Sequence, residues 1–223
     1  LATQRTFLDD ASHQLRTPLT TLATQVGFAL RASDPATQHE ALQTIKAQLD
    51  ETVRQTNQML SLARTDSAQL ALQDTDLVAL AREATRSSWA SARESGIDLG
   101  FDAPDGALVL AVQPSLLREA LANLLHNALR YTPHGGQVTV RVWRSAEASH
   151  LGVVDDGPGI PEDELAHAGE RFFRGSNTSQ PGTGLGLAIV QAIAVRHGAS
   201  LQLGTGAQQR GLAATLVFPH TPT

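Results

Sequence analysis

Apolar side chains recur at a heptad spacing through residues 1–66, a stretch with one glycine, Gly27. In its first half, one heptad position is shared by Leu8, Leu15, Leu22 and Ala29. The second half sets Leu42, Leu49, Thr56 and Ala63 against Ile45, Thr52 and Met59. Between the halves Ser33-Asp34-Pro35 breaks the run, because proline disfavours helix in the residue before it and starts a new helix well. The pattern predicts a hairpin of two helices with two apolar seams.

Two helices alone bury too little apolar surface, so the two seams predict a four-helix bundle made by two copies of the chain. The alternative is a hairpin that packs against the C-terminal part of its own chain. Either arrangement would cover the second seam, and the pattern favours the homodimer.

From residue 67 onward the apolar positions follow helix and strand periods in turn. Helices are expected at about 77–95, 114–131 and 185–197. Strands are expected at about 97–101, 108–112, 138–142, 151–154, 201–203 and 213–218. Residues 65–74 lose the heptad spacing and are expected to form a linker. This mixture predicts a two-layer α/β sandwich with helices on one face of the sheet.

Composition limits the possible classes of function. The net charge is −5 and no cluster of Lys and Arg marks a nucleic-acid-binding surface. The absence of cysteine excludes disulfides and thiolate zinc sites. No apolar run approaches the roughly 18 residues of a membrane span. Since the chain begins with Leu1, we expect it to be a fragment whose membrane segments would lie upstream.

Three polar motifs lie in the second part of the chain. Asn123 and Asn127 share one face of a helix, where amide oxygens can hold a hard cation such as Mg²⁺. Asp155 starts a glycine-rich turn and offers an acceptor for an exocyclic amine. The run Gly182-Thr-Gly184-Leu-Gly186 opens an apolar helix, whose first N–H groups can receive phosphates. Together the motifs predict a nucleotide site.

In this order the three motifs resemble the N, G1 and G2 boxes of histidine kinases, within the larger group of Bergerat-type ATPases. Residues 170–174 resemble the F box of these kinases, and residues 7–19 resemble their H box. The resemblance runs from about Leu1 to Phe218, and five motifs in the correct order make it specific.

The resemblance implies a dimerisation and histidine phosphotransfer hairpin at 1–66 and a catalytic Bergerat-type ATP-binding domain at 67–223. It implies a protein histidine kinase that uses ATP and Mg²⁺, autophosphorylates His13 and passes the phosphoryl group to an Asp of a response regulator receiver domain. The chain would then be the cytoplasmic portion of an inner-membrane sensor.

The resemblance to the H box makes His13 the expected phosphoacceptor. A histidine is mostly neutral at pH 7 and keeps one ring nitrogen free to attack, which suits this role. Pro18 removes the N–H that the Gln14 carbonyl would accept, so a bend is expected beside His13. Gln14 departs from the family, which usually has Glu or Asp there. An amide can orient the ring but cannot accept its proton, so this departure bears on the rate of the reaction and not on the role of His13. Thr17 matches the position that positions water to hydrolyse a partner's phospho-aspartate, although it could equally bond its own backbone.

In the ATP-binding domain, the resemblance makes Asn127 the expected Mg²⁺ ligand. ATP hydrolases of this fold have a Glu at the position of Asn123, and that Glu activates water. An Asn cannot do this, so Asn123 argues for transfer to His13. Arg130 is expected near phosphate and Tyr131 near the nucleotide.

The glycine motifs and the F box complete the expected ATP site. Asp155 is the expected adenine-reading residue, with Gly157 and Gly159 allowing close approach of the backbone. Arg171 or Arg174 is expected to reach a phosphate, and residues 175–181 to form a lid. The hinge and phosphate cradle are assigned to Thr183, Gly184, Leu185 and Gly186.

Two other functions compete with this assignment. The first is an ATP hydrolase of the same fold that uses nucleotide as a conformational clamp, which Asn123 and His13 oppose. The second is a non-catalytic dimeric adaptor that only binds a regulator, which the intact nucleotide motifs oppose.

Overall fold

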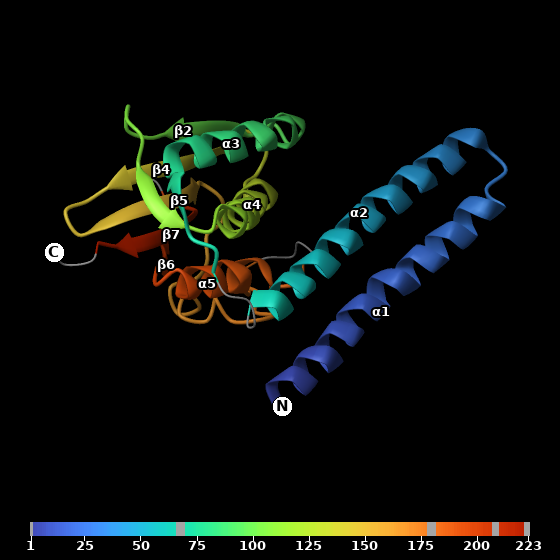
Figure 1. The fold of residues 1–223 in the computed structure, drawn as a ribbon. Coiled ribbons are helices and arrows are strands. Elements are labelled where there is room, and N and C mark those ends of the chain that lie inside the picture. The colour runs from blue at the N-terminus through green and yellow to red at the C-terminus, as the bar shows by residue number, and fades with distance from the viewer. Residues whose placement is uncertain (1, 66–69, 178–181, 207–209, 221–223) are drawn as a thin grey trace. The chain divides into compact units, whose positions relative to one another are not determined.

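The computed structural model describes residues 2–65, 70–177, 182–206 and 210–220, with the side chains of 2–15, 17 and 61–65 excepted. The chain divides into two compact units, Leu1–Arg64 and Thr65–Thr223, called here the hairpin unit and the α/β unit (Figure 1). No helix in these described ranges is long and apolar enough to span a membrane.

The hairpin unit consists of α1 (Ala2–Arg31) and α2 (Pro35–Thr65), and α1 runs through Pro18 without interruption. The residue before Pro35, Asp34, starts the second helix. Its carboxylate accepts hydrogen bonds from the Thr37 N–H (2.9 Å) and hydroxyl (2.8 Å), which lower the pKa of Asp34. Pro35 then occupies the first helical position, where its missing N–H has no helical partner to lose. The predicted hairpin and its break are therefore confirmed.

The two apolar seams of α2 differ in exposure. Ala41 and Thr52 are buried and Ile45 is half-buried, so one face of α2 is covered. The neighbouring stripe is open: Leu42 is 54% exposed, Leu49 49% and Val53 53%. Leu19 and Val26 of α1 are also exposed. A single chain therefore covers one seam and leaves the other uncovered.

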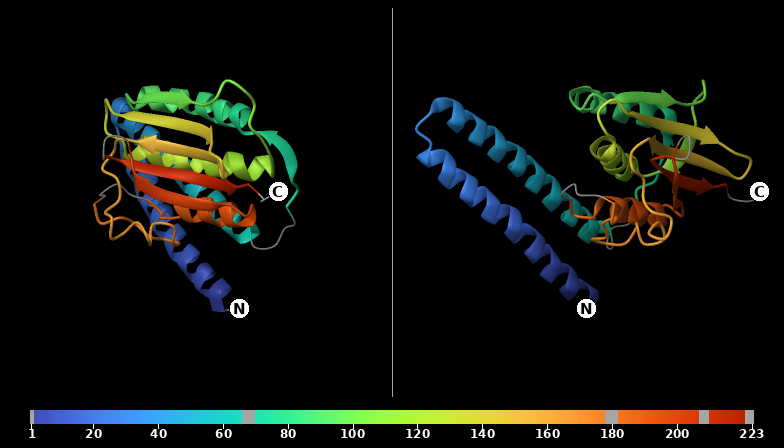
Figure 2. Two further views of the ribbon diagram at one scale, coloured as in Figure 1. Left: turned by 90° about the vertical axis from the view of Figure 1, so that its left-hand side faces the viewer. Right: turned by 180° about the vertical axis from the view of Figure 1, so that it is seen from behind.

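In the α/β unit, five strands form one sheet in the order β2 (Asp98–Asp102), β4 (Gln137–Arg144), β5 (Ala148–Asp155), β7 (Leu212–Pro219), β6 (Ser200–Thr205). The β2–β4 pair is parallel and the other pairs are antiparallel. Figure 2 shows the sheet in front of three helices: α3 (Leu77–Glu94), α4 (Pro114–Tyr131) and α5 (Gly186–Arg196).

The core of the α/β unit lies between this sheet and the helices. Alternate residues of β4 are buried, namely Val138, Val140 and Val142, because successive side chains of a strand point to opposite faces. On the helix side, fully buried residues recur at helical spacing and include Leu117, Leu121, Leu125, Ile189 and Ile193. The expected two-layer α/β sandwich with helices on one face is confirmed.

One predicted region was wrong. Within the expected linker 65–74, Gln73 begins strand β1 (Gln73–Asp76), which pairs antiparallel with β3 (Val109–Val112). The strand at 108–112 therefore belongs to a separate two-stranded sheet. The sequence of β1, Gln-Asp-Thr-Asp, has no alternation of apolar and polar residues. The strand is defined only by its backbone pairing with β3, which the sequence pattern does not reveal. Residues 66–69 of the expected linker lie outside the described part of the chain.

His197 joins the end of α5 to the start of α4. Its Nε2 accepts the Gln113 N–H (3.0 Å) and its Nδ1 lies 2.8 Å from the Ile193 carbonyl oxygen. This pair of bonds requires the neutral ring with the proton on Nδ1. Burial lowers the pKa of His197 below 6.5, and Arg196 lowers it further, while the bond to Ile193 opposes the shift.

We predict that the free energy of unfolding decreases as the pH falls below 6.5, the unfolded-state value of this group. The folded-state pKa is lower, so the unfolded chain takes up the proton first and is favoured by acid. Urea unfolding at a series of pH values measures the slope. His197→Gln should reduce that slope, and an unchanged slope in this variant would assign the dependence to other groups.

Candidate functional site

Asn127 lies where the last turns of α4 meet the first turn of α5. A Cβ added to Gly186 would be 3.0 Å from Asn127 Nδ2 and 3.2 Å from its Oδ1, so the amide packs directly on this glycine. One turn earlier, Asn123 is 8% exposed and its Nδ2 donates to the Glu119 carbonyl (3.0 Å). The two asparagines are therefore not equivalent, because the Asn127 amide faces the glycine run while Asn123 also bonds its own helix.

Asp155 ends β5 and is 7% exposed. Its Oδ1 accepts two backbone N–H groups, from Gly157 (3.0 Å) and from Leu212 (3.1 Å). Burial raises the pKa of Asp155 above its ordinary value, while these two hydrogen bonds act in the opposite direction. Neither bond uses Oδ2, which leaves a second acceptor on the same carboxylate for a ligand.

Glycines allow the backbone around Asp155 to close. Gly211 has φ +74°, and a Cβ there would overlap the Asp155 carbonyl oxygen at 1.8 Å. Gly159 has φ +68°, and a Cβ there would lie 2.7 Å from the Gly211 carbonyl oxygen. The turn 155–159 therefore packs on the connection between β6 and β7. Sequence reasoning missed Gly211 and Leu212, although Gly206 and Gly211 mark that connection.

The first turn of α5 has no side-chain cap. Leu185 occupies the N-cap position. The buried Thr183 instead accepts the Leu185 N–H through its hydroxyl (3.3 Å). Uncapped N–H groups at a helix N-terminus, with Gly186 offering no side chain to cover them, form a suitable site for an anion.

The segment 170–177 is attached to both glycine motifs. The Phe172 N–H donates to the Gly184 carbonyl (3.1 Å), and Phe172 has φ +66°, which is rare for a residue other than glycine. The Asn177 amide donates to the Gly159 carbonyl (3.0 Å), and Glu164 accepts the Ser176 N–H (3.0 Å). Of the expected lid 175–181, residues 178–181 lie outside the described part.

Tyr131 borders the same region. Its hydroxyl lies 3.5 Å from the position of a Cβ on Gly182, and its carbonyl oxygen lies 3.1 Å from one on Gly157. Arg130 is half-exposed and Arg174 is exposed. The α/β unit thus brings the asparagine helix and both glycine motifs together. His13, Gln14 and Thr17 are in α1 of the hairpin unit, and their side chains lie outside the described set.

The residues present fit an adenine nucleotide. A buried carboxylate with one unused oxygen is suited to accept a hydrogen bond from an exocyclic amine. The uncapped helix with its glycines is suited to phosphate groups, and the Asn127 amide oxygen is a ligand type that Mg²⁺ accepts. Asp155 therefore suits the base of a nucleotide, and the start of α5 with Asn127 suits its phosphates and metal ion.

Comparison with known proteins agrees with this assignment. Residues 112–222 match the histidine kinase-, DNA gyrase B- and HSP90-like ATPase family, and residues 3–68 match the His kinase A (phospho-acceptor) domain. The sensor protein QseC of Salmonella typhi is 37% identical over 209 residues, which make up 92% of this chain and 45% of QseC. The chain spans about half the length of the curated relatives it matches.

Solved structures show the same fold. The mycobacterial sensor histidine kinase MprB has 31% identity and a TM-score of 0.59, and the match covers 68% of this chain and all of that one. The histidine kinase ThkA, solved in complex with the response regulator protein TrrA, has 22% identity and a TM-score of 0.76. That match covers 95% of this chain and 60% of ThkA. The chain belongs to the sensor histidine kinases.

We predict that Asp155→Asn weakens ATP binding about tenfold or more while the fold is retained. The amide oxygen can still accept the Gly157 and Leu212 N–H groups, but an NH₂ group replaces Oδ2 and cannot accept from adenine. Loss of a hydrogen bond to a charged group costs about 1.5–3 kcal/mol. Isothermal titration with ATP and GTP measures the change.

Asp156→Asn is the matched control. Asp156 lies in the same glycine turn, and its Oδ1 accepts the Gln137 N–H (2.8 Å), which the asparagine can also accept. ATP affinity should stay within about twofold in this control. Equal preference for ATP over GTP in Asp155→Asn and the parent chain would refute the role given to Asp155.

Proposed function

We propose that this chain is the kinase core of a sensor protein, which binds MgATP in the α/β unit and transfers the γ-phosphoryl group to His13. The observation that carries the proposal is the arrangement around Asp155 and Asn127. An open carboxylate oxygen and an uncapped helix N-terminus occur there in a chain whose first residues match a phospho-acceptor domain. In this proposal the α/β unit binds the nucleotide and the hairpin unit supplies the phosphoryl acceptor.

ATP is proposed to bind with adenine at Asp155 and its phosphates at the N-terminus of α5. Asn127 would hold Mg²⁺ between the phosphates and the end of α4, since its amide packs on Gly186. The metal would neutralise phosphate charge and orient the transferred group. Asn123 supplies no carboxylate to activate water, which favours transfer to a side chain over hydrolysis.

In the transfer step a ring nitrogen of His13 attacks the γ-phosphorus. The N–P bond forms as the bond to the bridging oxygen breaks, and ADP leaves. The proton on the other ring nitrogen must pass to solvent or to a base. The Gln14 amide oxygen can hold this N–H in place but cannot take the proton. Such transfer needs little basic assistance when its transition state is loose, so positioning carries most of the catalysis.

The proposed partner is the receiver domain of a response regulator, whose Asp would accept the phosphoryl group from His13. ThkA, which has the same fold, binds a response regulator protein, and this supports the assignment. Thr17, one turn after His13, is proposed to position water for a separate reaction, in which water attacks the partner's phospho-aspartate and releases inorganic phosphate. Since the relatives are longer sensor proteins, we propose that the chain is the cytoplasmic portion of a membrane-bound sensor.

A homodimer is proposed from the hairpin unit. The open seam contains Leu42, Leu49 and Val53, each about half exposed, and it runs along the helix that follows the phospho-acceptor helix. Burying such a stripe against a second copy removes apolar surface from water at about 25 cal/mol per Å². A four-helix bundle is the arrangement that two such hairpins form.

The first test concerns His13. His13→Gln should abolish labelling of the chain by γ-labelled ATP and leave ATP affinity within a few-fold, because the nucleotide residues belong to the other unit. The label on the parent chain should be lost in acid and kept in base, as expected for a phosphoramidate. His39→Gln is the matched control, since His39 is an exposed histidine of α2. Persistent label in His13→Gln would identify another acceptor.

The second test concerns the seam. Leu49→Glu should shift the chain from dimer to monomer in sedimentation at tens of micromolar, because it places a charge on the apolar contact. Ala47→Glu adds the same charge at an exposed position of α2 outside the open stripe and should leave the dimer intact. A monomeric parent chain at this concentration would exclude the four-helix bundle.

A further inference from the structure

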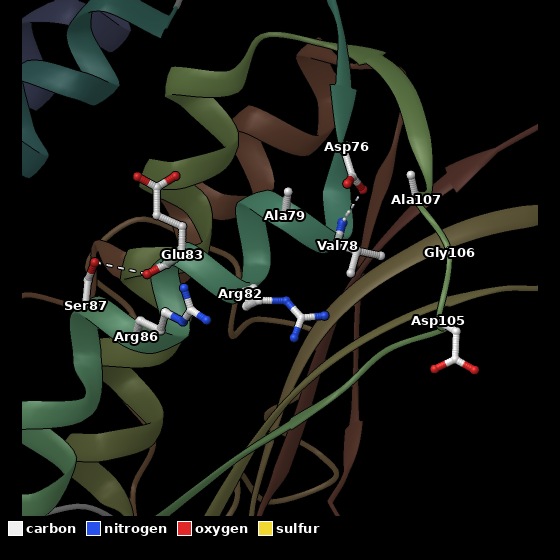
Figure 3. A pocket seen from close by; sticks show the side chains of 10 residues that line it. All are labelled: Asp76, Val78, Ala79, Arg82, Glu83, Arg86, Ser87, Asp105, Gly106 and Ala107. Carbon is white, nitrogen blue, oxygen red and sulfur yellow. Dashed lines mark hydrogen bonds between the residues drawn. The ribbon is translucent and has the colours of Figure 1, made fainter.

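A cavity of about 490 Å³ lies between α3 and the loop that joins β2 to β3 (Figure 3). Its walls are the N-terminal half of α3, the end of β1 and residues 105–107 of the loop. No residue of the nucleotide site described above lines it. The volume falls within the range of about 300–1,000 Å³ that small-molecule sites occupy.

Two guanidinium groups come from successive turns of the α3 wall. Arg82 and Arg86 are four residues apart and therefore lie on one face of the helix. Figure 3 shows Arg82 extending from α3 toward the loop that carries Asp105. The Arg82 guanidinium also lies over the Phe101 ring, 4.9 Å from its centroid. Stacking of this kind holds the guanidinium plane and leaves its N–H edge for a carboxylate or phosphate.

The acidic residues on the α3 side of the cavity are already engaged. Glu83 pairs with Arg118 at 3.4 Å. Asp76 caps α3, since its Oδ1 accepts the Val78 N–H (3.0 Å) and the Leu108 N–H (3.2 Å). Across the described ranges, no residue forms a hydrogen bond or ion pair with the Arg86 side chain. The adjacent charges of Arg82 and Arg86 are therefore not neutralised by these carboxylates.

Like charges four residues apart on a helix disfavour the helix by a few tenths of a kcal/mol, and a bound anion would remove this repulsion. Beside the two arginines, Ala79 and Ala107 present small apolar surfaces within the same cavity. Asp105 on the opposite loop limits the space for negative charge to the α3 side. The cavity thus combines two arginines on the α3 wall with small apolar side chains on both walls, Ala79 on α3 and Ala107 on the loop.

We propose that this cavity is an anion-binding site, separate from the nucleotide site, for a small organic acid. Its carboxylate or phosphate group would bridge Arg82 and Arg86, and its body would pack on Ala79 and Ala107. The site lies at the junction of β1 and α3, the first two elements of the α/β unit. A ligand there would stabilise the position of α3 relative to β1, where the chain enters that unit. The proposal goes beyond the kinase function and does not depend on it.

The test is a titration of the full chain with citrate and, separately, with pyrophosphate. The nucleotide site is first filled with Mg²⁺ and a non-hydrolysable ATP analogue, so that pyrophosphate does not enter it. NMR signals of the arginine Nε–H groups report the site directly. Either anion should shift Arg82 and Arg86 saturably, and the anion that binds more tightly identifies a carboxylate or a phosphate ligand.

Arg82→Gln and Arg86→Gln should each weaken this binding about tenfold, because each removes a charge-assisted hydrogen bond. Arg93→Gln is the matched control, an exposed arginine of the same helix outside the cavity, and should change affinity less than about twofold. Binding of the ATP analogue shows that each variant is folded. No saturable shift at about 10 mM anion, an equal shift at Arg93, or binding retained in both cavity variants would overturn the proposal.

Discussion

Burying a carboxylate is costly unless it is hydrogen-bonded. One oxygen of Asp155 accepts N–H groups from the turn after β5 and from the first residue of β7. Gly157 is two residues after Asp155, whereas Leu212 is 57 residues further along the chain. The Asp155 side chain therefore joins the end of β5 to the start of β7. Because both bonds use Oδ1, the fold holds the carboxylate in place and still leaves Oδ2 for recognition.

The rest of the site follows from that fixed point. Gly159 and Gly211 bring their backbones into contact beside Asp155, and Asn177 attaches the segment 170–177 to the Gly159 carbonyl. Phe172 then bonds Gly184, which positions the start of α5. The proposed adenine and phosphate ends of the site are thereby linked through backbone contacts. The asparagines of α4 complete this arrangement, because Asn127 packs on Gly186.

Local signals in the sequence predicted most of the fold. Helix α4 begins at Pro114 and ends at Tyr131 as expected, because a proline at the first position and an apolar stripe mark it. Strand β1 was missed because its polar residues are defined only by pairing with β3. The roles of Leu212 and His197 depend on contacts between residues far apart in the sequence, which no local pattern reveals. The roles of His13, Gln14 and Thr17 stay predictions, since their side chains lie outside the described set.

The uncovered stripe of Leu42, Leu49 and Val53 has a consequence for how stability is defined. When a second copy covers such a stripe, folding and association form one equilibrium, and mass action enters the stability of each chain. The melting temperature then rises with protein concentration although no contact within the chain changes. Dilution alone would lower the fraction of intact phospho-acceptor bundles, so the number of chains in a cell would set how much of the protein is able to signal.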